Sequence, residues 1–252
     1  MKLSILGTKI DALTKQETLA RIEDFLQEKK FHQIATVNPE FILEAQKDPA
    51  FHFVLTNCDL NVPDGKGILI AIWILWFKSL LSQKSTTYGL RFAKIYPGID
   101  LMWDILAIAH KKNLKVFFVA NNRGLSTWEE TAQAIKKIYP SINISGTNLD
   151  PGKKNITNYE FFVATYHIVF CNFGAPEQEI FLRSVKNAKI ASVRLVMGVG
   201  GSFDYITGKV PRAPQWMRIC GLEWFFRLLI QPKRWKRILN AVIIFPLKVL
   251  RK

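Results

Sequence analysis

The chain has 252 residues, of which 49% are hydrophobic, so it can bury the core of a large folded domain and is not an intrinsically disordered protein. Its formal net charge is +15, and residues 209–252 alone contain eleven lysines and arginines against a single acid, Glu223. A basic segment that also carries three tryptophans predicts an anionic lipid surface or another polyanion as its partner.

The cysteines and the apolar runs indicate the cellular compartment of the protein and how it associates with a membrane. Cys58, Cys171 and Cys220 lie far apart, which favours neither a disulfide framework nor a zinc site and fits a reducing cytosol. The opening residues predict no secretory signal peptide. The longest uncharged run, residues 67–77, is eleven residues long, whereas a membrane-spanning helix needs about 20. We therefore expect a peripheral rather than an integral membrane protein.

Apolar runs rich in β-branched and aromatic residues alternate with helix-length segments, which predicts an α/β fold with a sheet flanked by helices. The predicted strands are residues 33–37, 52–55, 115–120, 142–145, 167–172 and 193–198. The predicted helices are residues 15–28, 39–47, 67–80, 101–111, 126–138, 176–185 and 216–230. Thr14 with Glu17 and Ser126 with Glu129 have the spacing of capping boxes.

The alternating pattern ends near residue 208, so we expect an α/β catalytic domain over residues 1–208 and a helical, basic C-terminal appendage over residues 209–252. The polar segment 79–97 is expected to be either a mobile lid or a long connection.

Polar residues follow the first two apolar runs, and ligands of open α/β sheets bind at the carboxyl ends of strands. Thr36 and Asn38 follow the first run, although Asn38 is equally suited to capping a helix that starts at Pro39. Asp64 follows the second. Asp-Gly is a common turn signal, but the apolar helix predicted next to Asp64 would raise its pKa toward that of a useful base.

Two glycine-containing stretches follow later runs. In the first, Gly174 precedes a helix start where Gln178 is placed to donate to a sugar or phosphate, while Glu177 and Glu179 complement the helix dipole. In the second, residues 198–204, glycine backbone N–H groups can approach a phosphate closely.

Several site classes are absent from the sequence. The glycine spacing is not that of a dinucleotide-binding fingerprint, and neither a P-loop nor a Gly-x-Ser-x-Gly elbow occurs. There is no Asp-x-Asp, and the four histidines lie singly, so neither a metal site nor a cofactor is predicted.

Eight motifs, taken in order, resemble those of the WecG/TagA/CpsF family of bacterial glycosyltransferases, and the resemblance covers nearly the whole chain. They are Thr36-x-Asn38-Pro39-Glu40, Asp64-Gly65-x-Gly67, Gly98-x-Asp100-Leu101, Gly174-x-Pro176-x-Gln178-Glu179, Gly198-x-Gly200-Gly201-x-Phe203-Asp204, Gly208, Arg212-Ala213-Pro214 and Gly221-Leu222-Glu223-Trp224-x-x-Arg227.

The resemblance implies a Rossmann-like, largely parallel sheet with a membrane-docking C-terminal appendage. It also implies inverting, metal-independent transfer of a sugar, typically of the N-acetylmannosamine type, from a UDP-sugar to a polyprenyl-diphosphate-linked N-acetylglucosamine. Such enzymes work peripherally at the cytoplasmic face of the bacterial inner membrane, in the synthesis of cell-surface polysaccharides.

The resemblance also assigns roles to residues of this chain. Asp64 would deprotonate the acceptor hydroxyl, and Thr36, Asn38 and Gln178 would line the sugar and acceptor site. The substrate-binding set further includes Gly174, Gly198, Gly200, Gly201 and Asp204. Arginines can bind a diphosphate bidentately, and the candidates are Arg212, Arg227, Arg234 and Arg237.

Two departures from the family pattern leave an alternative open. Ala120 begins a stretch where the family usually has paired glycines, and Ile95 stands in place of an arginine, with Lys94 and Arg91 as the candidate substitutes. The alternative is a non-catalytic, membrane-associated subunit of a polysaccharide assembly complex. Nucleic-acid binding is disfavoured because the positive charge is concentrated in an apolar tail.

Overall fold

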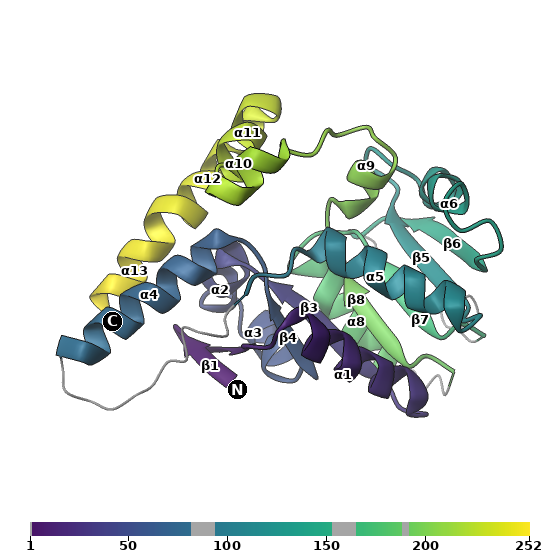
Figure 1. Ribbon diagram of the computed structural model, residues 1–252, viewed down its shortest axis with the longest axis horizontal. Helices are drawn as coiled ribbons and strands as arrows, with labels where there is room; N and C mark the ends of the chain where they lie inside the picture. The colour runs from purple at the N-terminus through teal and green to yellow at the C-terminus, as the bar shows by residue number, and fades with distance from the viewer. Residues whose placement is uncertain (1, 82–93, 153–164, 188–191) are drawn as a thin grey trace.

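The computed structural model describes residues 2–81, 94–152, 165–187 and 192–252 (Figure 1). The segment expected to be a lid or a connection therefore lies largely outside the described residues, as does Arg91. Six strands form one sheet in the order β4-β3-β8-β7-β5-β6, and every neighbouring pair is parallel. They are β3 (His32–Val37), β4 (Leu60–Pro63), β5 (Val116–Asn121), β6 (Ile144–Leu149), β7 (Ile168–Cys171) and β8 (Leu195–Gly198). The predicted α/β, Rossmann-like class is confirmed.

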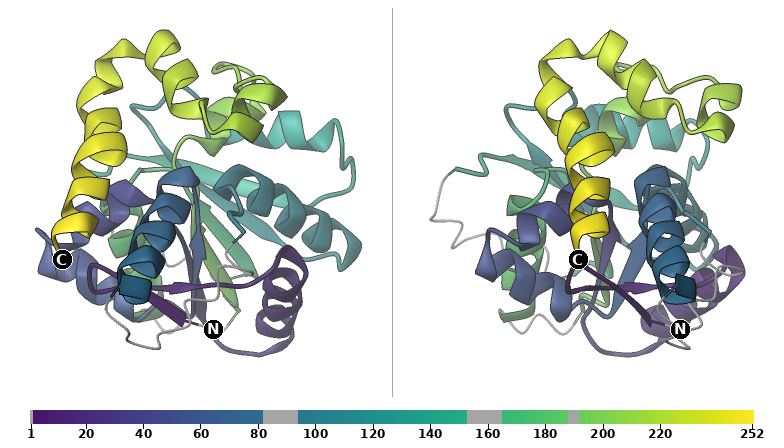
Figure 2. Two further views of the ribbon diagram at one scale, coloured as in Figure 1. Left: turned by 60° about the vertical axis from the view of Figure 1, so that its left-hand side comes forward. Right: turned by 90° about the vertical axis from the view of Figure 1, so that its left-hand side faces the viewer.

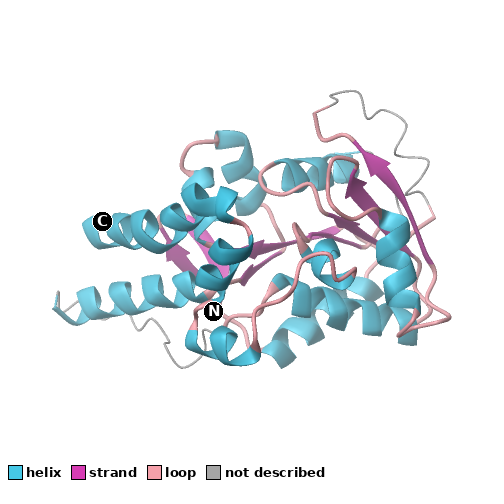
Figure 3. Cartoon of the chain, turned by 90° about the horizontal axis from the view of Figure 1, so that it is seen from above, coloured by secondary structure: helices cyan, strands magenta, loops and turns pink. Residues whose placement is uncertain are grey.

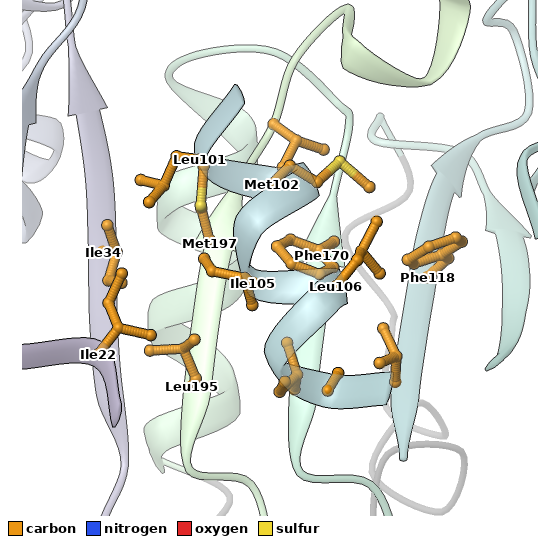
Figure 4. Close-up of a cluster of buried hydrophobic side chains, with 14 of the residues drawn as sticks. Ile22, Ile34, Leu101, Met102, Ile105, Leu106, Phe118, Phe170, Leu195 and Met197 are labelled. Atoms are coloured by element: carbon orange, nitrogen blue, oxygen red, sulfur yellow. The ribbon is translucent and has the colours of Figure 1, made fainter. Parts of the chain in front are cut away.

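Helices cover both faces of this sheet, as its parallel strands require. One face is covered by α1 (Lys15–Gln27), α5 (Gly98–Lys111), α6 (Trp128–Lys136) and α9 (Ser202–Ile206). Figure 4 shows Leu101, Met102, Ile105 and Leu106 of α5 lying over strand residues such as Phe170. The other face is covered by α2 (Pro39–Ala45), α3 (Pro49–Thr56), α4 (Lys66–Leu81) and α8 (Glu177–Asn187).

The helix starts show how local sequence sets these boundaries. Thr14 and Glu17 form the predicted capping box of α1. The second predicted box is wrong by one residue, because Thr127 caps α6 and pairs with Glu130. Ser126 is buried instead, and its hydroxyl donates to Asp204 at 2.8 Å.

Two predicted elements are corrected. Residues 52–55 are not a strand, because Asp48 caps a helix whose first residue is Pro49, and this start signal outweighs the apolar run. The predicted helix 216–230 is two helices, α10 (Gln215–Cys220) and α11 (Glu223–Ile230), because Gly221 adopts a left-handed conformation with φ of 80°.

Three strands had no counterpart in the prediction. β4 has only four residues and contains Asn61 and Pro63, so it carries no β-propensity signal. β1 (Lys2–Ile5) and β2 (Thr8–Asp11) form an antiparallel hairpin, also of four residues each. Such short strands are set by tertiary pairing rather than by their own sequence.

The C-terminal segment runs back along the molecule as a chain of short helices (Figure 2). After α11 come a 3₁₀ turn (Pro232–Arg234), α12 (Trp235–Leu239), a π-helical turn η2 (Asn240–Ile244) and α13 (Phe245–Arg251). Phe245 and Val249 of α13 are fully buried in the same core cluster as Ile68 and Ile72 of α4. The end of the expected appendage therefore shares a core with the sheet domain. No helix in the described part of the chain combines the length and apolar character needed to cross a membrane.

This shared core makes Phe245 a stability determinant. Phe245→Ala should lower the free energy of unfolding by about 3–5 kcal/mol, because it leaves a cavity among side chains that cannot all move in. Phe53 is 59% exposed, so Phe53→Ala is the matched control and should change stability by less than about 0.5 kcal/mol. Urea unfolding followed by circular dichroism measures both. Equal effects of the two substitutions would contradict the shared core.

Candidate active site

The carboxyl ends of the central strands bring the predicted site residues to one edge of the sheet. Val37 pairs with Pro63, so Asn38 and Asp64, the next residues along each chain, lie side by side. β8 pairs with both β3 and β7, and Cys171 at the end of β7 pairs with Gly198 at the end of β8. The loops that follow these two strands, which contain Gly174 and Gly200, therefore begin at the same edge of the sheet. This edge is where an open α/β sheet binds its ligand.

Asp64 lies between β4 and α4, and its backbone N–H donates to the Val37 carbonyl at 2.8 Å. Its side chain is half-buried. The pKa of Asp64 is raised to about 7, first by loss of hydration and then by the negative charge of Glu223, while the positive charge of Arg227 and the Gly98 backbone N–H act in the opposite direction. A carboxyl group with a pKa near 7 is suited to proton transfer at neutral pH.

Thr36 lies near the end of β3, and Asn38 follows the strand as the residue that caps α2. Thr36 is buried beneath the first turn of α5, so closely that a Cβ at Gly98 would lie 3.2 Å from its Oγ1 atom. Asn38 is half-buried, and its Oδ1 accepts a hydrogen bond from the Phe41 N–H at 3.1 Å. The capping interpretation of Asn38 is thus confirmed.

Helix α11 of the C-terminal segment carries one negatively and one positively charged residue that act on Asp64. Glu223 and Arg227 interact electrostatically with Asp64. Both line a small pocket together with Tyr205, Val210, Pro211, Ala213, Phe226, Ile230 and Gln231. The Arg227 Nε donates to the Tyr205 hydroxyl at 3.0 Å, which fixes the guanidinium over the tyrosine ring. The C-terminal segment therefore lies close enough to the sheet edge for Glu223 and Arg227 to act on the charge of Asp64.

Arg212 is held by an ion pair at the entrance to this segment. Its two terminal nitrogens donate to the two carboxylate oxygens of Asp100 at 2.6 and 2.8 Å, and its buried Nε has no partner among the described residues. Such bidentate pairs fix geometry as well as charge. Arg212 thus ties the start of the C-terminal segment to the first turn of α5.

The other two predicted arginines lie beyond α11. Arg237 pairs with Glu40, its Nε donating at 2.7 Å, at the start of α2. Arg234 is half-buried and forms no ion pair with any residue the structure describes. Burial first, and then the charges of Arg227 and Arg237, lower the pKa of Arg234. The positive charge of Arg234 is thus disfavoured by two neighbouring cations, and an anion beside Arg234 would stabilise it.

Gln178 connects the two glycine-containing loops, one after β7 with Gly174 and one after β8 with Gly200. Its side chain is buried, and its Oε1 accepts hydrogen bonds from the Gly174 N–H at 3.1 Å and the Gly200 N–H at 3.0 Å. Its Nε2 donates to the Glu179 carboxylate at 2.7 Å. A Cβ at Gly198 would collide with both side chains, which explains the glycine there. The sequence suggested Gln178 as a hydrogen-bond donor to a substrate, but its amide instead forms hydrogen bonds within the protein. The N–H groups of Gly174 and Gly200 are likewise bonded to Gln178.

Asp204 and Glu179 have structural roles that the sequence did not predict. Asp204 accepts from the Ser126 hydroxyl, so it joins α9 to the start of α6. Glu179, which the sequence suggested only as a helix-dipole partner, is fully buried, and burial raises its pKa to about 8. One of its oxygens has no hydrogen-bond partner among the described residues.

Sequence reasoning missed Tyr205 and gave no role to Asp100 and Glu223. Tyr205 lies one residue after a quoted motif, and nothing in its spacing distinguishes it. Glu223 had a signal, because it is the single acid among the basic residues of the C-terminal segment. At the departures from the family pattern, Ile95 is half-buried and Lys94 is exposed.

A family model described as the glycosyl transferase WecG/TagA/CpsF family matches residues 3–252. The chain belongs to this family. It is 30% identical over 217 residues to the N-acetylglucosaminyldiphosphoundecaprenol N-acetyl-beta-D-mannosaminyltransferase of Bacillus subtilis (strain 168), covering 86% of this chain and 78% of that protein. It is 29% identical over 255 residues to the protein of the same name from Staphylococcus aureus (strain MRSA252), covering 98% of this chain and 92% of that protein.

The buried Glu179 predicts a pH dependence of stability. Its pKa is about 8 in the folded protein and near 4.5 when unfolded, so the folded state holds one more proton between these values. The contribution of Glu179 to the free energy of unfolding is therefore largest below about pH 4.5. It decreases by up to about 1.4 kcal/mol per pH unit as the pH rises to 8.

Glu179→Gln should remove this part of the slope, since the amide does not titrate, and should leave the part that the raised pKa of Asp64 contributes below about pH 7. Glu177 lies two residues earlier in the same helix and is exposed, so Glu177→Gln is the matched control and should keep the slope of the wild type. Denaturant unfolding between pH 5 and 8 measures it. A Glu179→Gln variant with the slope of the wild type would show that Glu179 is ionised in the fold.

Proposed function

We propose that this glycosyltransferase moves an N-acetylmannosamine-type sugar from a UDP-sugar to a polyprenyl-diphosphate-linked N-acetylglucosamine, with inversion, during synthesis of a cell-surface polysaccharide. The names of its relatives support this acceptor and this sugar. The observation that carries the proposal is the placement of Asp64, whose pKa is near 7, beside Arg227 from the C-terminal segment.

The chemistry is a single displacement. Asp64, in its ionised form, takes the proton of the acceptor hydroxyl, and the resulting oxygen attacks the anomeric carbon of the donor from the face opposite the UDP group. The new carbon–oxygen bond forms as the bond to the β-phosphate breaks, and UDP leaves with the electron pair. Asn38 lies next to Asp64 and Thr36 lies two residues before Asn38, against Gly98, and the two would orient the acceptor and the transferred sugar.

The departing diphosphate gains negative charge that must be stabilised if no metal takes part. Arg227, Arg234 and Arg237 form the cation cluster that we assign to this task, and a diphosphate beside Arg234 would compensate the repulsion that its two neighbours exert on it. Arg212 would act differently, by holding the segment in place through Asp100. The glycine loops at Gly174, Gly198, Gly200 and Gly201 would shape the floor of the site, fixed by Gln178, with Asp204 supporting α9.

The C-terminal segment would also bring the enzyme to its lipid-linked acceptor. Trp216, Trp235 and Leu229 are more than half exposed and are surrounded by lysines and arginines. Tryptophan favours the membrane interface, and basic residues attract anionic headgroups. We infer peripheral attachment at the cytoplasmic face of the bacterial inner membrane, where nucleotide sugars are made.

The first test is transfer from a panel of UDP-sugars to a polyprenyl-diphosphate N-acetylglucosamine analogue, in detergent and without divalent metal. The wild type should use one donor, and Asp64→Asn should lose about 10²–10⁴-fold in rate, because the amide cannot accept the proton. Asp24 on α1 is exposed, so Asp24→Asn is the control and should keep full activity. An Asp64→Asn variant as active as the wild type would rule out Asp64 as the base.

The cation cluster predicts a second effect. Arg234→Gln should lower kcat/KM for the UDP-sugar by roughly 10- to 100-fold, the value of one or two charge-assisted hydrogen bonds to phosphate. Lys233 is the exposed neighbour, and Lys233→Gln should change kcat/KM little in detergent. Steady-state kinetics at several donor concentrations measure both. Equal, small effects would place the diphosphate elsewhere.

A further inference from the structure

Helix α4 is apolar on every side. Ile68, Ala71 and Ile72 are buried in the core beneath it. On its outer side Ile70, Trp73 and Phe77 are 49%, 59% and 58% exposed, and their spacing of three and four residues places them in one stripe. A helix that is hydrophobic all round is normally buried on all sides or lies in lipid.

The last helices continue this exposed apolar surface. Ile243, Leu247 and Leu250, on η2 and α13, are 48%, 45% and 51% exposed. α13 runs beside α4 and the two extend together beyond the sheet, as the view from above shows (Figure 3). Lys78 near the end of α4 donates to the Leu250 carbonyl at 2.7 Å, so the pair is joined at its far end. We call Ile70, Trp73, Phe77, Ile243, Leu247 and Leu250 the α4–α13 surface.

The charge around the α4–α13 surface indicates which kind of partner can cover it. Neither α4 nor η2 and α13 contain an acidic residue, whereas Lys78, Lys248, Arg251 and Lys252 lie among the apolar side chains. A second copy of the chain would bring two positively charged surfaces together without an acid to compensate them. An anionic bilayer provides both the apolar interior and the negative headgroups that this combination fits.

We propose that the α4–α13 surface is a second membrane-contacting element, which inserts its apolar side chains below the headgroups of an anionic bilayer. α4 has 16 residues and is about 24 Å long, so it would lie in the interfacial region rather than span the membrane. The inference rests on the proposed function for its purpose, because the lipid-linked acceptor lies in the same bilayer.

This arrangement would set the position of the catalytic base. α4 starts at Lys66, two residues after Asp64, and Trp73 lies about 10 Å further along the helix axis. At the same end, the Lys66 Nζ donates to the Ile219 carbonyl of α10 at 2.6 Å. Insertion of the α4–α13 surface would therefore hold Asp64 and the C-terminal segment at a fixed height above the acyl chains, where an acceptor diphosphate lies.

The test compares two double variants in sedimentation with phosphatidylglycerol vesicles. Trp73→Glu with Phe77→Glu should bind roughly a hundredfold more weakly than the wild type, since each aromatic side chain loses at least about a factor of ten when it cannot enter the bilayer. Phe53 on α3 and Ile138 in the turn after α6 are 59% and 58% exposed. The matched control, Phe53→Glu with Ile138→Glu, should bind as the wild type does.

Two results would overturn the proposal. One is vesicle binding by the Trp73→Glu, Phe77→Glu variant equal to that of the wild type. The other is a wild-type dimer in analytical ultracentrifugation that this variant dissociates while vesicle binding is retained, since the surface would then belong to a second copy. Transfer to a water-soluble, short-chain acceptor tests the proposed function separately, and the variant should keep the wild-type rate there. Vesicle binding decides the α4–α13 surface whatever that assay gives.

Discussion

The whole arrangement depends on how the C-terminal segment is fixed to the sheet domain. It is attached at its start by the bidentate ion pair between Arg212 and Asp100, and at its end by Phe245 and Val249, which are buried with residues of α4. α11 lies between these two points, and its residues Glu223 and Arg227 interact electrostatically with Asp64. Deleting residues 209–252 would therefore remove part of a core as well as part of the site.

The electrostatic state of Asp64 follows from this attachment. Protein atoms from several elements deprive the carboxyl group of water, and Glu223 adds a like charge, so the protonated form is favoured. Arg227 and the Gly98 N–H act against both effects and keep the pKa near neutrality rather than above it. Glu223 and Arg227 both come from the C-terminal segment, whereas the Gly98 N–H comes from the first residue of α5. The base would be tuned only when that segment is in place.

The glycine loops show a second kind of constraint. Gln178 uses one oxygen to hold Gly174 and Gly200, and the nitrogen of the same amide is held by Glu179. A protonated Glu179 fits this role, because its burial disfavours charge. The loops are thus supported by a small buried polar network, in which each member positions the next.

Sequence reasoning predicted the α/β class, five of the six sheet strands and the residues that the sheet edge brings together. These follow from β-branched runs and from polar residues at strand ends, as at Asn38 and Asp64. It missed β4, which has no propensity signal, and mistook part of α3 for a strand because the start signal at Asp48 and Pro49 was overlooked. The internal use of Gln178 and the meeting of Glu223 with Asp64 depend on tertiary contacts across more than twenty residues, which no local pattern encodes.

The most direct test of this account is the pH dependence of kcat/KM for sugar transfer in the wild type and in Glu223→Gln. The wild-type rate should rise through a midpoint near pH 7 as Asp64 ionises, and the midpoint should lie at lower pH in Glu223→Gln, since the neutral amide removes the repelling charge. An unchanged midpoint in an active Glu223→Gln variant would contradict the claim that the C-terminal segment tunes the base.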